Sequence, residues 1–488
     1  MAYKHLFRSL ALFMLILPGL GAMAQLRNAN WIFIRSLQFG YGAPQLIPSV
    51  GYAGSEASSL SNPQGDLLAF FGNDLRCSDG SLMPVPSSFT NTLQAFTQCG
   101  LILPWPGDPT KLAAFQGYTV AGQQASMCSL MVGCVDLTSN GGLGAITSAP
   151  TYLDDSLARK LTAVPHTNGQ DYWILTQRAA SNAFLAYRFR PNGVDPNPVV
   201  SYAGAILPDG VGGVAGNYMT HGNLVANYAG DALVSVSFCD LQPVPDTSIT
   251  ELFHFNNATG AVTYWASLAS DRSFMGEGGA EFSPDGTKLY VAEFPWPSTS
   301  MNLIQYDLTS PLGAAIQNTE TFIGDIPASG ILHSAVPIAG APDGRIYIGM
   351  GELPQYLAVI EHPDSLGLAC GLQPNGVYLS GPPQGFIAMP NFCKRYHDSE
   401  MTVGQSEVPA LKFALNAWPV PTAELLNVDV PEAGQLAVLD IFGRDVLRQR
   451  VSVRGTYALP MTGMAPGTYA VRLFNEKGMI RSFRIVKE

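Results

Sequence analysis

The stretch Phe282-Ser-Pro-Asp-Gly-Thr-Lys-Leu-Tyr-Val-Ala292 places an Asp-Gly pair between two short runs, and Ala341-Pro-Asp-Gly-Arg-Ile-Tyr-Ile348 repeats the pattern. Asp-Gly between runs rich in β-branched and aromatic residues predicts a strand, a tight turn and a second strand. Weaker copies have their turn glycines at Gly65, Gly169 and Gly230. The last four turn glycines are 56–61 residues apart, and the first gap is nearly twice as long. The sequence therefore predicts a repeated β unit.

The length of this unit selects the fold. Each copy is followed by a further β-rich run with a polar end, and four strands in a repeat of this size are typical of one β-propeller blade. Sandwich domains near 100 residues would give a period about twice as long. Only 13% of the residues are charged, while Gly (50) and Pro (36) are abundant, which favours strands and turns over helices. We expect an all-β chain whose body is a β-propeller of about seven blades.

The N-terminus has the pattern of a secretory signal peptide. Lys4 and Arg8 precede an apolar run over residues 10–17, and a small-x-small site ends at Ala24, before Gln25. The run is too short to span a bilayer unaided, so we expect cleavage between Ala24 and Gln25. No later stretch is apolar enough for a transmembrane segment, so none is expected after removal of residues 1–24.

The chain changes character near residue 411. Residues 25–410 hold 14 Lys and Arg against 30 Asp and Glu, whereas residues 411–488 hold 10 against 7. Short alternating strands then follow in quick succession, which predicts a small C-terminal Ig-like β-sandwich. The predicted divisions are a signal peptide (1–24), a propeller body (25–400), a linker (401–412) and a C-terminal domain (413–488). The acidic body argues against DNA or RNA as a partner.

Three motifs in the tail carry a resemblance. They are Asn416-Ala-Trp-Pro-Val-Pro421, Val438-Leu-Asp-Ile-Phe-Gly-Arg-Asp-Val446 and Met464-Ala-Pro-Gly-Thr-Tyr469. The tail resembles the type A C-terminal sorting domain of the type IX secretion system of Bacteroidetes-like outer membranes, although Ala417 and Trp418 separate the usual Asn-Pro pair. The resemblance implies that the tail delivers its cargo to this machinery, so that the protein is secreted or held at the outer-membrane cell surface. The motif positions are Asn416, Pro419, Gly443, Pro466, Gly467 and Tyr469.

The body carries a second resemblance. Its segments include Asn30-Trp-Ile-Phe33, Asp136-Leu-Thr-Ser-Asn-Gly-Gly-Leu-Gly144, Phe253-His-Phe-Asn-Asn-Ala-Thr-Gly260 and Met389-Pro-Asn-Phe392. It resembles the propeller-like (WD40/YVTN-like) surface proteins of Bacteroidetes that often carry this tail. The resemblance implies a fold and a location but no activity.

Seven cysteines lie in the exported body, and an oxidising compartment favours disulfides. The preferred pairs are Cys128 with Cys134 and Cys370 with Cys393, and a weaker pair is Cys77 with Cys99. None has the Cys-x-x-Cys spacing of a zinc site. The Asp-Gly turns lack the alternating acidic ligands of a calcium loop. We therefore expect no metal and no cofactor.

Polar residues spread over several repeats offer one route to catalysis. A propeller channel could gather His166, His221 and His333 with Glu277 or Glu281 into an acid–base or metal site. The alternative is that each histidine completes hydrogen bonds within its own blade. No nucleophile elbow or phosphate loop occurs in the sequence.

Three functions remain open at this level. The preferred hypothesis is a binding or adhesion module whose surface ligand is a glycan or a protein. The second is a hydrolase or lactonase with its site in the central channel. The third is a structural component of a surface or motility assembly.

Overall fold

The computed structural model describes residues 24–32, 36–39, 44–47, 58–72, 74–89, 98, 100–118, 127–207, 221–238, 249–268, 278–293, 300–310, 312–327, 338–349, 355–379, 389–396, 416–430, 433–440, 445–474 and 480–488. The fold is all-β, and the described helices are four short pieces: η1 (Ala24–Asn28), η2 (Asn140–Gly142), α1 (Gly313–Gln317) and η3 (Gly367–Cys370). The chain divides into two compact units, Met1–Val403 and Gly404–Glu488. The predicted signal peptide up to residue 23, and the predicted linker 401–412, lie outside the described residues.

The described residues of the first unit, the body, form seven antiparallel sheets in chain order. Sheet 1 comprises β1 (Asn30–Ile32), β2 (Ser36–Gln38) and β3 (Gln45–Ile47). Sheet 2 comprises β4 (Ser58–Ser61), β5 (Leu67–Phe71) and β6 (Leu75–Cys77). Sheet 3 comprises β7 (Gly100–Trp105), β8 (Asp108–Tyr118), β9 (Cys128–Asp136), β10 (Ala145–Ile146) and β11 (Thr151–Leu157). Sheet 4 comprises β12 (Thr162–Pro165), β13 (Tyr172–Gln177), β14 (Ala183–Arg190), β15 (Gly193–Val194) and β16 (Val199–Tyr202).

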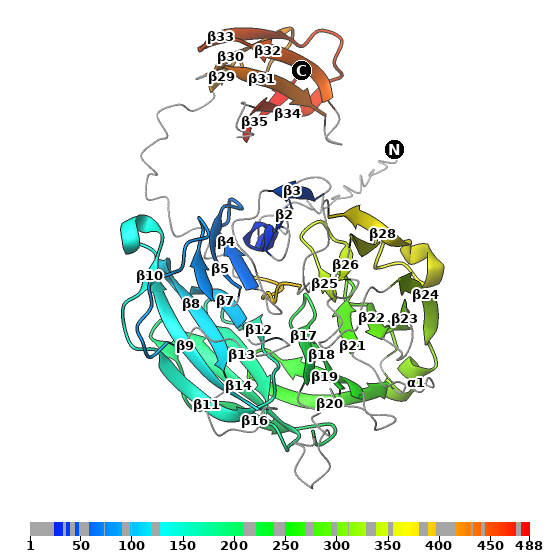
Figure 1. The fold of residues 1–488 in the computed structure, drawn as a ribbon. Coiled ribbons are helices and arrows are strands. Elements are labelled where there is room, and N and C mark those ends of the chain that lie inside the picture. Colours follow the sequence, from blue (N-terminus) through cyan, green and yellow to red (C-terminus); the bar gives the residue numbers. More distant parts are fainter. Residues whose placement is uncertain are drawn as a thin grey trace, which may run out of the picture. The chain divides into compact units, whose positions relative to one another are not determined.

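The last three sheets have four strands each. Sheet 5 comprises β17 (His221–Ala226), β18 (Ala232–Phe238), β19 (Ile249–Asn256) and β20 (Ala261–Leu268). Sheet 6 comprises β21 (Gly278–Phe282), β22 (Lys288–Glu293), β23 (Ser300–Asp307) and β24 (Thr321–Pro327). Sheet 7 comprises β25 (Ile338–Gly340), β26 (Ile346–Gly349), β27 (Tyr356–Ile360) and β28 (Leu372–Tyr378). The sheets follow one another around a ring with their first strands innermost, which makes the body propeller-like (Figure 1).

The predicted turn glycines connect the first and second strands of five sheets. Gly65, Gly169, Gly230, Gly286 and Gly344 all have positive φ, between 72° and 92°. Glycine suits this left-handed region because it has no Cβ to clash with the backbone. Sheet 3 fills the long first gap of the sequence pattern, with its turn at Gly107 (φ 72°). The repeat predicted from the sequence is confirmed at these turns.

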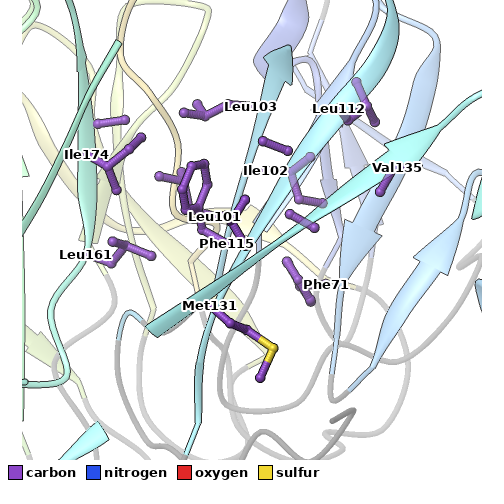
Figure 2. Close-up of a cluster of buried hydrophobic side chains, with 14 of the residues drawn as sticks. Phe71, Leu101, Ile102, Leu103, Leu112, Phe115, Met131, Val135, Leu161 and Ile174 are labelled. Carbon is purple, nitrogen blue, oxygen red and sulfur yellow. The ribbon is translucent and has the colours of Figure 1, made fainter. Parts of the chain in front are cut away.

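Apolar side chains fill the spaces between neighbouring sheets. One cluster joins sheets 2, 3 and 4, and Figure 2 shows Phe71, Phe115, Leu161 and Ile174 among its members. Further clusters join sheets 4 and 5, sheets 5 and 6, and sheets 6 and 7. Each inner strand therefore has a neighbouring sheet packed on both of its faces. Because successive side chains point to opposite faces and both faces are buried, these strands consist largely of apolar and small residues.

Side chains of sheets 1 and 7 close the ring. Trp31 of β1 packs edge-on against Tyr347 of β26, with ring centroids 5.6 Å apart, and Phe39 packs against the same tyrosine at 5.4 Å. Sheets 1 and 2 are joined by polar contacts, since Asn30 Nδ2 donates to Ser61 Oγ at 2.9 Å and to the Gly65 carbonyl at 2.7 Å. Sheets near the two ends of the body are thus packed together.

The second unit, the tail, has two sheets around one core. One sheet has the order β29 (Asn416–Trp418), β30 (Leu425–Val430), β33 (Gly455–Pro460). The other has the order β32 (Asp445–Val451), β31 (Gly434–Leu439), β34 (Gly467–Phe474), β35 (Ile480–Lys487). Leu426, Val438, Leu459 and Val471 meet in the core between them. This arrangement is a small sandwich.

Candidate functional site

His166, the first predicted channel residue, lies in a turn. It follows β12, and its Nδ1 accepts the N–H of Asn168 at 2.9 Å. Its ring packs against Trp173 with centroids 5.4 Å apart, and burial lowers its pKa. His166 therefore completes the turn of its own sheet, as in the alternative reading of the sequence.

His221 lies at the other end of the neighbouring inner strand. It begins β17, whereas His166 follows the end of β12. The turn after β17 lies beside the end of β12, because a Cβ on Gly230 would be 2.7 Å from Val164. Burial, with the nearby charges of Arg159 and Lys160, lowers the pKa of His221 to about 3. Such an imidazole is a weak base at neutral pH.

Glu281 is the predicted channel residue that the structure places at the centre of the body. It lies on β21, and its side chain is almost completely buried. Its carboxylate forms an ion pair with Lys394 and accepts the N–H groups of Gly340 (2.9 Å) and Phe282 (3.0 Å). His333 and Glu277 lie outside the described residues. In the described part of the chain, no three His, Cys, Asp or Glu side chains lie close enough to hold a metal ion.

Residues 389–396, here called the central segment, occupy the middle of the ring and appear in gold in Figure 1. Asn391 makes the widest set of contacts. Its Nδ2 donates to the carbonyl oxygens of Gly100 (3.1 Å) and Leu161 (2.8 Å), and its own carbonyl accepts from Ser58 Oγ at 2.9 Å. This one residue therefore binds the inner parts of sheets 2, 3 and 4.

The rest of the central segment reaches the N-terminal part of the body. Asn28 Nδ2 donates to the Cys393 carbonyl at 3.1 Å, and Tyr396 Oη donates to Asn28 Oδ1 at 2.8 Å. Phe392 packs against Trp31 with centroids 6.0 Å apart. The central segment therefore lies in the middle of the ring, and one of its residues, Lys394, engages Glu281.

A second polar cluster lies between sheets 4 and 5. Lys160, two residues before β12, donates from Nζ to Gln177 Oε1 (3.1 Å), to Ser235 Oγ (2.8 Å) and to the Ser237 hydroxyl. These three acceptors use all three N–H groups of an ammonium. Complete burial lowers the pKa of Lys160 to about 7, and the negative charge of Glu251 opposes this shift. The lysine therefore links β13 of sheet 4 to β18 of sheet 5.

Glu251 completes this cluster. It lies opposite Ser235 in the pairing of β18 with β19, and both its oxygens accept the N–H of Ala205 at 3.1 Å. Burial raises the pKa of Glu251. Gly204 has a φ of 75°, and a Cβ there would lie 2.6 Å from Glu251 Oε2. Glycine at this position therefore lets the backbone come close to the Glu251 carboxylate. The cluster is closed to solvent and acts as an interior bridge between sheets.

The outer strands of the same two sheets present exposed apolar side chains. We use the name rim patch for the exposed side chains of Val200 and Tyr202 on β16, of Ile206 after this strand and of Tyr264 on β20; Tyr202 is 75% exposed and Tyr264 50% exposed. Because Ser201 faces β20, its neighbours Val200 and Tyr202 point to the opposite face of β16. Strands β16 and β20 lie together here, since Ser201 Oγ accepts the N–H of Val262 at 3.0 Å.

A bulge skips Trp265 where β19 pairs with β20, and Trp265 stacks on exposed His254 with centroids 4.6 Å apart. Bulges often redirect side chains next to functional sites.

The cysteines differ from the sequence prediction. Cys77, Cys128, Cys134, Cys370 and Cys393 form no disulfide. Cys128 and Cys134 lie on the same strand, β9, where a rise of about 3.3 Å per residue separates their Cα atoms by roughly 20 Å. A disulfide requires Cα atoms within about 7 Å, so this predicted pair is wrong.

The other two predicted pairs are also not formed. Cys370 belongs to the apolar cluster of sheets 6 and 7, whereas Cys393 belongs to the cluster of sheets 2, 3 and 4. Neither forms a disulfide, nor does Cys77, and Cys99 lies outside the described residues. The two cysteines predicted to bracket one loop are therefore packed as separate apolar side chains.

The tail positions its motif residues near strand ends. Asn416 begins β29, Pro419 follows that strand, and Pro466 directly precedes β34, which Gly467 begins. Tyr469 lies in the tail core, and its Oη donates to the Ala465 carbonyl at 2.8 Å. Gly443 lies outside the described residues.

Comparisons with known proteins identify this tail. Residues 416–488 match the family described as the secretion system C-terminal sorting domain. A search of curated protein sequences gave no significant match.

Several solved structures match this chain at low sequence identity and low TM-score. A puromycin hydrolase is 14% identical, with 95% of this chain and 59% of that chain covered and a TM-score of 0.36. Prolyl oligopeptidase B from Galerina marginata is 11% identical, with 79% and 51% covered and a TM-score of 0.28. A structural genomics protein of unknown function from Bacteroides thetaiotaomicron is 11% identical, with 74% and 83% covered and a TM-score of 0.28. The chain spans between half and three fifths of the length of the first two.

The fold and the tail together define an exported all-β protein with a propeller-like body. Residues 416–488 are a C-terminal sorting domain of the type IX secretion system, and the protein is secreted to the outer-membrane cell surface. Among the residues that the structure describes, no helix has the length and apolar character to cross a bilayer.

Proposed function

We propose that this protein is a seven-bladed β-propeller that the type IX machinery exports and that acts at the cell surface as a binding module. The seven sheets in chain order, with inner first strands and packed first and last members, support the blade number. The sorting domain supports the location. The body then supplies a rigid scaffold that presents a ligand surface.

The observation that carries the binding role is the rim patch. Tyr202 and Tyr264 expose 75% and 50% of their surface on outer strands that lie together. Tyrosines are amphipathic and have few rotatable bonds, so they gain large contact area at low entropic cost, and they are common in binding surfaces. A glycan ring or a protein surface could stack on either tyrosine.

The hydrolase alternative has less support. Glu281 is paired with Lys394, His166 serves a turn, and His221 is a weak base in a closed site. Residues 389–396 occupy the middle of the ring where the predicted acid–base site would lie. The described residues therefore favour recognition at the rim over chemistry in the centre.

The test uses the purified mature chain on arrays of glycans and of outer-membrane proteins. The double variant Tyr202→Ser/Tyr264→Ser should lose at least about tenfold in affinity for any ligand found. Tyr378→Ser removes a tyrosine of similar exposure (52%) on β28 and should leave binding unchanged. A ligand that binds the double variant normally would reject the rim patch, and no ligand on either array would reject the binding role.

Export is tested separately in cells. Deleting residues 416–488 should abolish surface display while the body remains inside the cell, as detected by protease accessibility of intact cells. Surface display of the truncated chain would show that the body reaches the surface by another route.

A further inference from the structure

In the part of the chain that the structure describes, no sheet combines strands from both ends of the body. Among the described residues, sheet 1 contains strands from the N-terminal end alone, and sheet 7 contains strands from residues 338–378 alone. The two sheets meet through side chains, chiefly Trp31 with Tyr347. Among the described residues, side-chain packing rather than backbone hydrogen bonding therefore joins the first sheet to the last.

The central segment supplies bonds that cross the ring. Asn391 binds the inner parts of sheets 2, 3 and 4, and Lys394 pairs with Glu281 of sheet 6. Glu281 in turn accepts the N–H of Gly340 on sheet 7. Phe392 packs with the side chains of sheets 1 and 7. One short segment therefore contacts six of the seven sheets, namely sheets 1, 2, 3, 4, 6 and 7.

These contacts are buried. Asn391, Cys393 and Tyr396 are 8%, 0% and 2% exposed, and their polar partners are mostly backbone carbonyls or Asn28. A buried carbonyl that loses its donor has no water to replace it. Removing the segment would leave Gly100, Leu161 and Glu281 without these donors.

We propose that the centre of the ring is a peptide-binding site, and that residues 389–396 are its built-in ligand and lock the ring closed. The site recognises a segment with an amide side chain at position 391, a cation at 394 and a phenol at 396. Because the segment precedes the tail, removal of the tail after residue 403 leaves the lock in place. The proposal is independent of the rim patch and of any ligand there.

The experiment uses the full mature chain with a protease recognition sequence inserted between residues 380 and 388. After folding and purification, cleavage separates residues 25–388 from residues 389–488 without removing either. Gel filtration at micromolar concentration should recover both fragments together. A labelled synthetic peptide of residues 386–400 should exchange into the complex slowly.

Variants assign the binding to the named contacts. Asn391→Ala in the cleaved chain should release the C-terminal fragment at least about tenfold faster, and Tyr396→Phe, which removes one hydroxyl, should accelerate release by less. Asn375→Ala, the same change at an exposed position of β28, should have no effect. Should Asn391→Ala prevent folding, Tyr396→Phe and the competing peptide carry the test.

Immediate separation of the wild-type fragments while the body keeps its circular dichroism spectrum would overturn the proposal. Release rates that are the same for Asn391→Ala, Tyr396→Phe and wild type would overturn it as well.

Discussion

The centre and the rim of the body use polar and aromatic residues in opposite ways. In the centre, Glu281 and Asn391 are buried and form hydrogen bonds to distant parts of the chain. At the rim, Tyr202 and Tyr264 are exposed on strands that are already paired. The difference indicates that the centre stabilises the fold, whereas the rim side chains remain exposed.

The largest expected effect comes from the central ion pair. Glu281→Ala should lower the free energy of unfolding by about 4 kcal/mol, because it leaves the Lys394 charge buried without its partner. Adding Lys394→Met should recover part of this loss. Guanidinium unfolding of the mature chain measures both changes.

A pair nearer the surface provides the control. Arg345 and Glu361 lie 3.0 Å apart with side chains about a third exposed, so Glu361→Ala should cost less than about 1 kcal/mol. Equal losses for Glu281→Ala and Glu361→Ala would contradict the contrast between centre and rim.

The second effect is a pH dependence that comes from Lys160. Its pKa is about 7 when folded, whereas an unfolded lysine keeps its proton up to about 10.4. Between these values the unfolded state binds more protons, so stability should rise with pH, by up to about 1.4 kcal/mol per unit. Unfolding experiments between pH 7 and about 8.5 measure the slope.

Lys160→Met should flatten this slope, because the titrating group is gone. Lys111→Met is the matched control, since Lys111 is much more exposed and its pKa is raised above this window. The same slope in wild type and Lys160→Met would show that another group titrates.

The rim should tolerate change. Tyr202→Ser and Tyr264→Ser should each alter the free energy of unfolding by about 0.5 kcal/mol or less, because exposed positions contribute little to the core. Thermal unfolding of the two variants measures this. A loss above about 2 kcal/mol would make the patch part of the fold.

The smallest effect concerns the thiols. Five cysteines form no disulfide, so a reductant should not change the free energy of unfolding through them: Cys77, Cys128, Cys134, Cys370 and Cys393. Peptide mapping after alkylation in denaturant, without reductant, should find all five modified. A disulfide between any two of them would contradict the packing described above.

Local pattern predicted much of the fold. Gly286 and Gly344 allowed the hairpins around them to be predicted, because a tight turn between two consecutive strands needs a residue with positive φ, which is usually glycine. The turn at Gly107 was not predicted, because Pro106 precedes this glycine and its acidic neighbour, Asp108, follows it instead of preceding it. The tail was predicted well, since its motifs are local.

The centre could not be predicted in this way. Asn391 bonds to Gly100 and Leu161, which are 291 and 230 residues away, and no local pattern records such partners. The disulfide predictions failed for a related reason, because spacing along the chain ignores strand extension and sheet membership. The rim patch was also missed, since alternation in β16 puts Val200 and Tyr202 on one face without showing that this face is exposed.

Hydrogen–deuterium exchange of the intact mature protein tests the central claim most directly. Backbone amides of residues 389–396 should exchange as slowly as those of the inner strand β17, and cleavage of the tail after residue 403 should not change this protection. Exchange of residues 389–396 as fast as that of an exposed turn such as Gly141 would contradict the account.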